Sequence, residues 1–351
     1  MNKILPITTP IIDCYPDMAN MFSVLNCYDL PKKWILNNFI QIVYRRDEKN
    51  SFGSFLDLMR TGNDITIYQH CPYLDVNLMD KSFERNIFGD IFQFIQFCLK
   101  NNYYIQMYIN KKYISAAEDI NFDFMHEVFV YGIDQDNSII YLSDFYRGKY
   151  KRILCPFEEF ENAYLNSFKD NVYYRSAIYF DYPHMVKYNM DKIILFKYVA
   201  HELYDSDYSR VRRQICDYIE CKNSQNDIEN SYIASGYRFY YGLDFYDQLI
   251  LDIKEREFDI RKPYVLLSHK RILRLVIKEM ENVGNISQDN EKMLQLKLDA
   301  LILSFEKIYR RYVKISLKRE VKEKEVIDLC NYYAKLKELD WMFMKDVVDI
   351  L

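Results

Sequence analysis

The segments HEVFVYGID (126–134) and SIIYLSDF (138–145) decide the fold. Both are rich in β-branched and aromatic residues, as strands are. The polar link DQDN (134–137) between them suits a tight turn. We therefore expect an antiparallel hairpin. It would carry His126 at the start of its first strand and Asp144 at the end of its second.

Other elements of mixed type surround this hairpin in the first half of the chain. Apolar residues spaced as on one face of a helix follow Cys14 at Met18, Phe22 and Leu25. The further strands and helices expected in this half are YYIQMYI (103–109), VYYRSAIYF (172–180), FGDIFQFIQFCLK (88–100) and FEEFENAYLNSF (157–168).

The character of the sequence changes near residue 182. Seven of the eight prolines lie at or before Pro183, and charged residues become denser after it. Long amphipathic stripes in the second half are typical of a helix bundle. The helices expected there are 190–222, 242–256, 264–282, 288–318 and 322–347. We predict an α+β protein with an N-terminal domain over 1–182 and an all-helical part over 183–351.

Composition excludes several classes of function. At 50% hydrophobic and 28% charged residues, the chain is a folded protein. With 8 glycines in 351 residues and no glycine-rich phosphate loop, nucleotide binding by the common motifs is disfavoured. The net charge of −4 argues against nucleic acid as a partner. We expect no membrane span and no signal peptide, and hence a cytoplasmic protein.

Eight cysteines occur without any C-x-x-C pair. In a cytoplasmic chain of this size, we expect no disulfides. The cysteine spacing matches no zinc template, and His70-Cys71 has no further ligands at metal-site spacing. We therefore predict neither a metal nor a bound cofactor, and most of the cysteines should be small buried hydrophobes.

Cys14, His126 and Asp144 together suggest nucleophilic catalysis. A thiol with a pKa near 8.5 is activated at a helix N-terminus and by an imidazole that removes its proton. A carboxylate on the other imidazole nitrogen fixes its tautomer. In the expected hairpin, Asp144 falls roughly opposite residue 128, within side-chain reach of His126. Taken singly, these residues are more often a packing cysteine, a structural histidine and a turn former.

Their order along the chain resembles that of papain-like cysteine enzymes of the bacteriocin-processing peptidase type. The resemblance is greatest to the family of N-terminal domains typified by butirosin biosynthesis protein H. It covers about 170 residues. It rests on short motifs, namely Asp13-Cys14-Tyr15, Val24-Leu25-Asn26, Tyr103-Tyr104-Ile105, Lys112-Tyr113-Ile114, His126 to Asp134 with Gly132, YLSDFYRGKY (141–150) and Phe157-Glu158-Glu159-Phe160.

The resemblance implies a nucleophile at Cys14, a base at His126 and an orienting residue at Asp144. It also implies transfer of an acyl group from a carrier-protein thioester to an amine in specialised-metabolite biosynthesis. Phosphopantetheine would arrive on the carrier protein, whose docking residues would be Arg210, Arg212 and Arg213. A peptidase or amide hydrolase with the same triad, and a non-catalytic binding protein, are the alternatives.

The sequence departs from the papain-like pattern in one respect. Papain-like enzymes place a glutamine a few residues before the cysteine, where it stabilises the oxyanion. Residues 5–13 offer only Thr8 and Thr9 as side-chain donors. The backbone N–H of Cys14 at the helix start is therefore the expected first donor. Loss of one such donor costs about 10²- to 10³-fold in rate.

Overall fold

The chain forms two compact units, each built from two separate segments. The first unit comprises Met1–Pro31 and Asp64–Glu202, and the second comprises Lys32–Asn63 and Leu203–Leu351. The computed structural model confirms the α+β class. The structure describes residues 2–47, 55–58, 68, 71–117, 120–168, 191–200, 208–224 and 237–351.

This division differs from the boundary predicted at residue 182. Strands β2 (Ile42–Asp47) and β3 (Phe55–Leu58) lie in the predicted N-terminal domain, yet they belong to the second unit. The reason is pairing: β2 lies between β3 and β10 (Tyr237–Tyr241) in a three-stranded antiparallel sheet. The C-terminal part is therefore not wholly helical, although it is helical from residue 244 on.

An antiparallel seven-stranded sheet forms the centre of the first unit. Its strand order is β4-β9-β5-β6-β7-β8, and β1 also pairs with β6. The strands are β1 (Asn2–Ile4), β4 (Leu74–Asp80), β5 (Tyr104–Asn110), β6 (Met125–Asp134), β7 (Ile139–Tyr146), β8 (Lys149–Pro156) and β9 (Lys192–Tyr198).

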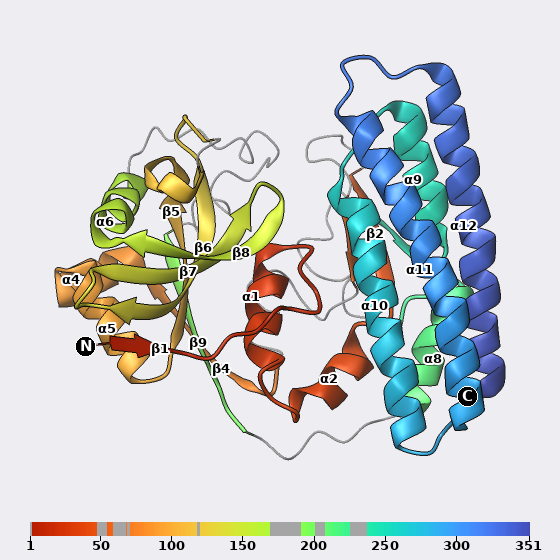
Figure 1. The fold of residues 1–351 in the computed structure, drawn as a ribbon, viewed down its shortest axis with the longest axis horizontal. Coiled ribbons are helices and arrows are strands. Elements are labelled where there is room, and N and C mark those ends of the chain that lie inside the picture. Colours follow the sequence, from red (N-terminus) through yellow and green to blue (C-terminus); the bar gives the residue numbers. More distant parts are fainter. Residues whose placement is uncertain are drawn as a thin grey trace. The chain divides into compact units, whose positions relative to one another are not determined.

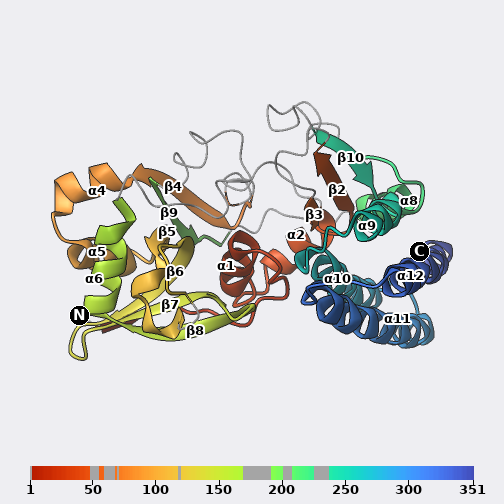
Figure 2. The ribbon, with the colours of Figure 1, turned by 90° about the horizontal axis from the view of Figure 1, so that it is seen from above.

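Helices cover both faces of this sheet. Figures 1 and 2 show α1 on one face and the other helices of the unit on the opposite side. These elements are α1 (Pro16–Leu25), α4 (Lys81–Phe88), α5 (Ile91–Lys100), α6 (Phe157–Leu165) and the 3₁₀ turns η1 (Lys111–Tyr113), η2 (Ser115–Ala117) and η3 (Asn166–Phe168). The predicted hairpin is β6 and β7, and the helices predicted after Cys14, at 88–100 and at 157–168 are present.

One predicted helix is partly wrong. The range 190–222 contains strand β9 (Lys192–Tyr198), and among its described residues only Tyr208–Ile219 form a helix, α8. The segment KIILFKY is a strand because it pairs with β4 and β5, both distant in sequence. The strand predicted at 172–180 lies outside the described residues.

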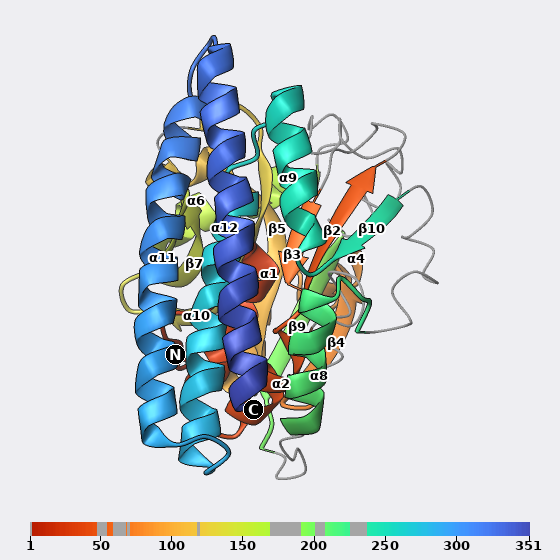
Figure 3. The same cartoon turned by 90° about the vertical axis from the view of Figure 1, so that its right-hand side faces the viewer.

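Long helices dominate the second unit (Figure 3). Helix α11 packs against α10 and α12, and α12 also contacts α8 and α9. Besides α8, the helices are α2 (Pro31–Asn38), α9 (Asp244–Glu255), α10 (Arg261–Asn282), α11 (Gln288–Ser316) and α12 (Glu323–Ile350). The four helices predicted from 242 onward are thus confirmed. Within the described part of the chain, no helix has the length and apolar character of a membrane span.

A buried ion pair crosses the core of this helical unit. Lys270 of α10 lies 2.6 and 2.7 Å from the two carboxylate oxygens of Asp340 on α12, and both side chains are fully buried. Tyr218 and Tyr246 donate hydrogen bonds to the same carboxylate. The neighbouring His269 is also buried, with Nε2 2.6 Å from the carbonyl oxygen of Ile40. His269 is thus a structural residue of this unit.

Candidate active site

The β6–β7 hairpin brings the predicted base and its orienting residue together. Phe129 pairs with Ser143 and Val130 with Leu142, so the same register places Asp144 opposite residue 128. Residues two apart on a strand share a face, which puts the side chains of His126 and Asp144 on one side. Nδ1 of His126 lies 3.0 Å from Oδ1 of Asp144. The predicted contact is confirmed, while its role in catalysis stays a prediction.

A third residue, which nothing in the sequence indicates, completes this cluster. Lys111, in η1, is 3% exposed, and its Nζ lies 2.8 Å from Oδ2 of the fully buried Asp144. Nζ also donates to the carbonyl oxygen of Phe145 at 2.7 Å and lies 4.3 Å from the centre of the Tyr146 ring. Lys112 follows directly and is exposed, and nothing in the local sequence separates the two lysines.

The contacts of His126 assign its tautomer. Both groups at Nδ1, the carboxylate of Asp144 and the carbonyl oxygen of Glu127 at 3.0 Å, are hydrogen-bond acceptors. Nδ1 therefore carries a hydrogen, and in the neutral imidazole Nε2 is the basic nitrogen. The ring stacks on Phe124 and the side chain is 25% exposed.

Electrostatics favours the charged forms of both residues. Burial acts to lower the pKa of His126, but the charge and hydrogen bond of Asp144 outweigh it, so this pKa is raised. Burial acts to raise the pKa of Asp144, but His126 and Lys111 together lower it below its usual range. Each residue thus favours the charged form of the other.

These shifts predict how the stability of the first unit depends on pH. The raised pKa of His126 contributes stability in full below its unfolded value of 6.5 and loses it as the pH rises through the folded value. We therefore expect His126→Gln to lower the free energy of unfolding more at about pH 5.5 than at about pH 9. The loss at the lower pH should be about 1.5–3 kcal/mol. Amide hydrogen exchange in β6 and β7 measures this difference. A pH-independent cost would contradict the prediction.

Cys14 lies directly before α1, as expected. Tyr15 is the N-cap residue and Pro16 the first helical residue, so the cysteine precedes the helix by two positions. Its side chain is 6% exposed, and Sγ lies 3.8 Å from Sδ of Met18, one turn along. All eight cysteines are free in this structure.

A buried polar network attaches α1 to the sheet. Asn20 donates from Nδ2 to Oε1 of Gln106 on β5 at 2.8 Å, and its Oδ1 accepts from the Tyr150 hydroxyl on β8 at 2.8 Å. Tyr68 donates to the same oxygen of Gln106 and to the carbonyl oxygen of Asp17. These bonds fix the helix at two strands and so fix the position of its N-terminal end.

The contacts of α1 also show which way it runs. Near its C-terminal end, Cys27 lies within electrostatic reach of Arg152, and further toward its N-terminus the helix contacts Tyr150. Going from Arg152 to Tyr150 along β8 leads toward the end of the sheet where β6 begins, so the N-terminus of α1 points to that end. Cys14 and His126 therefore lie at the same end of the sheet.

The two faces of the sheet restrict how Cys14 and His126 can come into contact. Phe129 and Ser143 share the face of Gln106, to which α1 is attached. By the alternation of side chains, His126 and Asp144 point to the other face. The hairpin thus forms the His126–Asp144 pair without the cysteine. The thiol and the imidazole can meet only around the end of β6, where His126 is the second residue.

Thr8 and Thr9, the nearest side-chain donors before Cys14 in the sequence, lie away from the start of α1. The N–H of Thr8 donates to the carbonyl oxygen of Ser23, and the carbonyl oxygen of Thr9 accepts from Asn26. Both contacts are at the C-terminal end of α1, and at 1.5 Å per residue this is about 10 Å or more from the helix start. The segment before Cys14 runs back along the helix, which carries the threonines away from the cysteine.

The predicted docking arginines lie on α8 of the second unit. Arg210 is half-buried and donates to Oδ1 of Asn38 at 3.0 Å, whereas Arg212 and Arg213 are exposed. Arg210 therefore has a structural contact, and its two neighbours face solvent. Of the His70-Cys71 pair, Cys71 is buried, and His70 lies outside the described residues.

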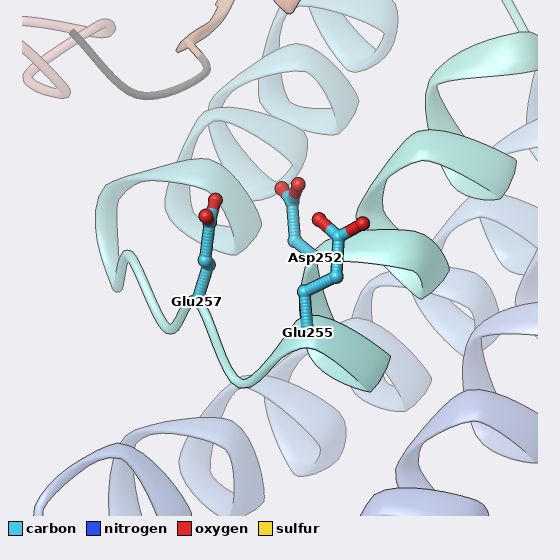
Figure 4. A group of neighbouring side chains, drawn as sticks. All are labelled: Asp252, Glu255 and Glu257. Carbon is cyan, nitrogen blue, oxygen red and sulfur yellow. The ribbon is translucent and has the colours of Figure 1, made fainter. Parts of the chain in front are cut away.

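Within the described ranges, one group of three acidic side chains has the spacing of a metal site. Asp252, Glu255 and Glu257 lie together near the end of α9 (Figure 4). Asp252 is buried and already paired with Lys262 at 2.5 Å and Arg46 at 2.9 Å, and Arg46 also binds Glu255. Because Lys262 and Arg46 already pair with two of these three carboxylates, the group is best explained as an ion-pair network.

No protein-family model and no curated protein matches this sequence.

Proposed function

We propose that this chain is a cysteine-dependent acyltransferase that forms an amide from a carrier-bound thioester and an amine. One observation carries the proposal. His126 is oriented by the buried Asp144, with Nε2 as its basic nitrogen, at the end of the sheet toward which the N-terminus of α1 points. Cys14 lies at that N-terminus.

The proposed reaction has two acyl transfers. Nε2 of His126 takes the proton of the Cys14 thiol, and the thiolate attacks the thioester carbonyl. The pantetheine thiolate leaves and takes the proton from the imidazolium, which leaves an acyl-cysteine. The amine then attacks this thioester and gives its proton to Nε2. The amide departs and the proton returns to the thiolate of Cys14.

The thiolate would depend mainly on His126. A helix N-terminus favours an anion, but Asp17 in the first turn of α1 offsets part of this effect. The raised pKa of His126 means that an imidazolium is readily formed beside Asp144. The backbone N–H of Cys14, just before the helix, remains the proposed oxyanion donor.

The proposed donor protein is an acidic acyl carrier. Arg212 and Arg213 are exposed neighbours on α8, and guanidinium groups pair well with carboxylates and phosphate. These two residues are the proposed docking contacts.

The test is to incubate the full chain with an acyl-loaded carrier protein and measure its intact mass. We expect an added acyl mass on the wild type and on Cys27→Ala, a control cysteine just beyond the other end of α1. We expect none on Cys14→Ala. An adduct that persists in Cys14→Ala would refute the assignment.

Products distinguish the alternatives. With an added amine, an acyl-enzyme that yields the amide supports transfer. Release of free acid alone would identify a hydrolase. A wild-type protein that binds the carrier but never becomes acylated would identify a binding protein.

A further inference from the structure

Lys111 is a buried cation at the far side of the His126–Asp144 pair. Removing an ammonium group from water costs several kcal/mol unless it is well paired. Here the group has the Oδ2 atom of Asp144 at 2.8 Å, the carbonyl oxygen of Phe145 at 2.7 Å and the ring of Tyr146 below it. All three contacts come from one end of β7, so Lys111 holds both the main chain and the side chain there.

The other oxygen of Asp144 is fixed as well. Oδ1 accepts a hydrogen bond from the N–H of Phe145 at 2.5 Å and lies 3.0 Å from Nδ1 of His126. Rotation of the carboxylate would break the contacts of both oxygens at once. The direction of Oδ1, and with it the orientation of the imidazole, therefore depends on what binds Oδ2.

We propose that Lys111 is a positioning residue of the active site, which holds Asp144 in the orientation that directs Oδ1 to His126. This inference rests on the function proposed above. Lys111 would touch neither the acyl group nor the thiol, and it would act only through Asp144 and through its charge.

Its charge also counteracts that of Asp144 at the imidazole. Three charged groups influence His126: Asp144 and Glu127 favour protonation, and Lys111 opposes it. Tyr146 lies against Lys111 and stays neutral, because burial raises its pKa far above the physiological range. Without Lys111, Asp144 would act unopposed, and His126 would remain protonated to a higher pH.

The chain provides a matched control at the next position. Lys112 is 39% exposed, and its Nζ lies 3.7 Å from Oδ1 of Asp123. Lys112→Met removes the same charge one residue away, without touching Asp144.

The experiment compares Lys111→Met, Lys111→Arg and Lys112→Met with the wild type in the full chain. NMR titration of the His126 imidazole is the first readout, and the rate of Cys14 acylation by the acyl carrier is the second. In Lys111→Met we expect the midpoint to move to higher pH and acylation to fall about 10- to 100-fold, as for other groups that orient a functional histidine. Lys111→Arg should restore both, and Lys112→Met should change neither.

Other outcomes separate the two proposals. A His126 midpoint that stays unchanged in Lys111→Met, or moves equally in Lys112→Met, overturns the role of Lys111. A moved midpoint in a protein whose Cys14 is never acylated supports the effect on His126 and refutes the acyltransferase. If Lys111→Met does not fold, a second comparison tests the same charge. The His126 midpoint is then measured in Asp144→Asn and in the double variant Lys111→Met/Asp144→Asn, where residue 144 is neutral in both. The midpoint of the double variant should lie at the higher pH.

Discussion

Replacing His126 by alanine is expected to slow acylation of Cys14 by about 10²- to 10⁴-fold, the usual contribution of a general base. The loss follows from the oriented imidazole, since without Nε2 no positioned group takes the thiol proton. Acylation of Cys14 should also be slower in Asp144→Asn than in the wild type. In the double variant His126→Ala/Asp144→Asn it should be no slower than in His126→Ala. Groups that act as one unit show such non-additivity. Single-turnover acylation, followed by intact mass, measures these rates.

A cross-link tests the geometry on which this result depends. Two cysteines form a disulfide only when their Cα atoms lie within about 7 Å. If the thiol and imidazole meet around the end of β6, His126→Cys should form a disulfide with Cys14 under mild oxidation. Asp136→Cys is the control, because this exposed residue lies in the turn at the opposite end of the β6–β7 hairpin. A bridge that forms from position 136 as readily as from 126, or none from 126, would contradict the proposed arrangement.

In the helical unit, Asp340→Ala is expected to lower the free energy of unfolding by about 3–5 kcal/mol. The reason is that Lys270 would be fully buried without its partner, so that it either keeps an unpaired charge or must give up its proton. The hydroxyls of Tyr218 and Tyr246 would also lose their acceptor. Urea unfolding followed by tryptophan fluorescence reports on this unit, because both tryptophans, Trp34 and Trp341, belong to it.

Asp346 on the same helix provides the control. It is partly exposed and pairs with Lys297 at 2.6 Å, so Asp346→Ala should cost about 0–1 kcal/mol. The double variant Lys270→Met/Asp340→Leu should recover most of the stability lost in Asp340→Ala, because apolar residues can replace a buried ion pair. Equal losses for the two aspartates would show that burial of the pair is not the cause.

Local patterns predicted the elements whose partners are near in sequence. The turn at 134–137 and the alternation on either side gave the β6–β7 hairpin, and the register then followed. The contact between His126 and Asp144 is a direct consequence. The apolar face of α11 could likewise be recognised from the sequence, because helical periodicity is a property of one segment.

What was missed depends on distant pairing. The segment KIILFKY reads as part of a helix until β4 and β5 provide its neighbours. Lys111 and Lys112 are indistinguishable in sequence, and only the third dimension shows which one is buried beside Asp144. Thr8 and Thr9 are likewise near Cys14 in the sequence, but they contact residues toward the C-terminal end of α1, which only the structure shows.

The path of the chain through its two units has a practical consequence. Because 32–63 belongs to the second unit, the polypeptide passes from one unit to the other three times. No single cut can release either unit whole. A fragment ending at residue 202 would contain Cys14, His126 and Asp144, but it would also carry β2 and β3 without β10, as an unpaired apolar hairpin prone to aggregation. Activity measured on such a truncated protein would therefore underestimate that of the whole chain.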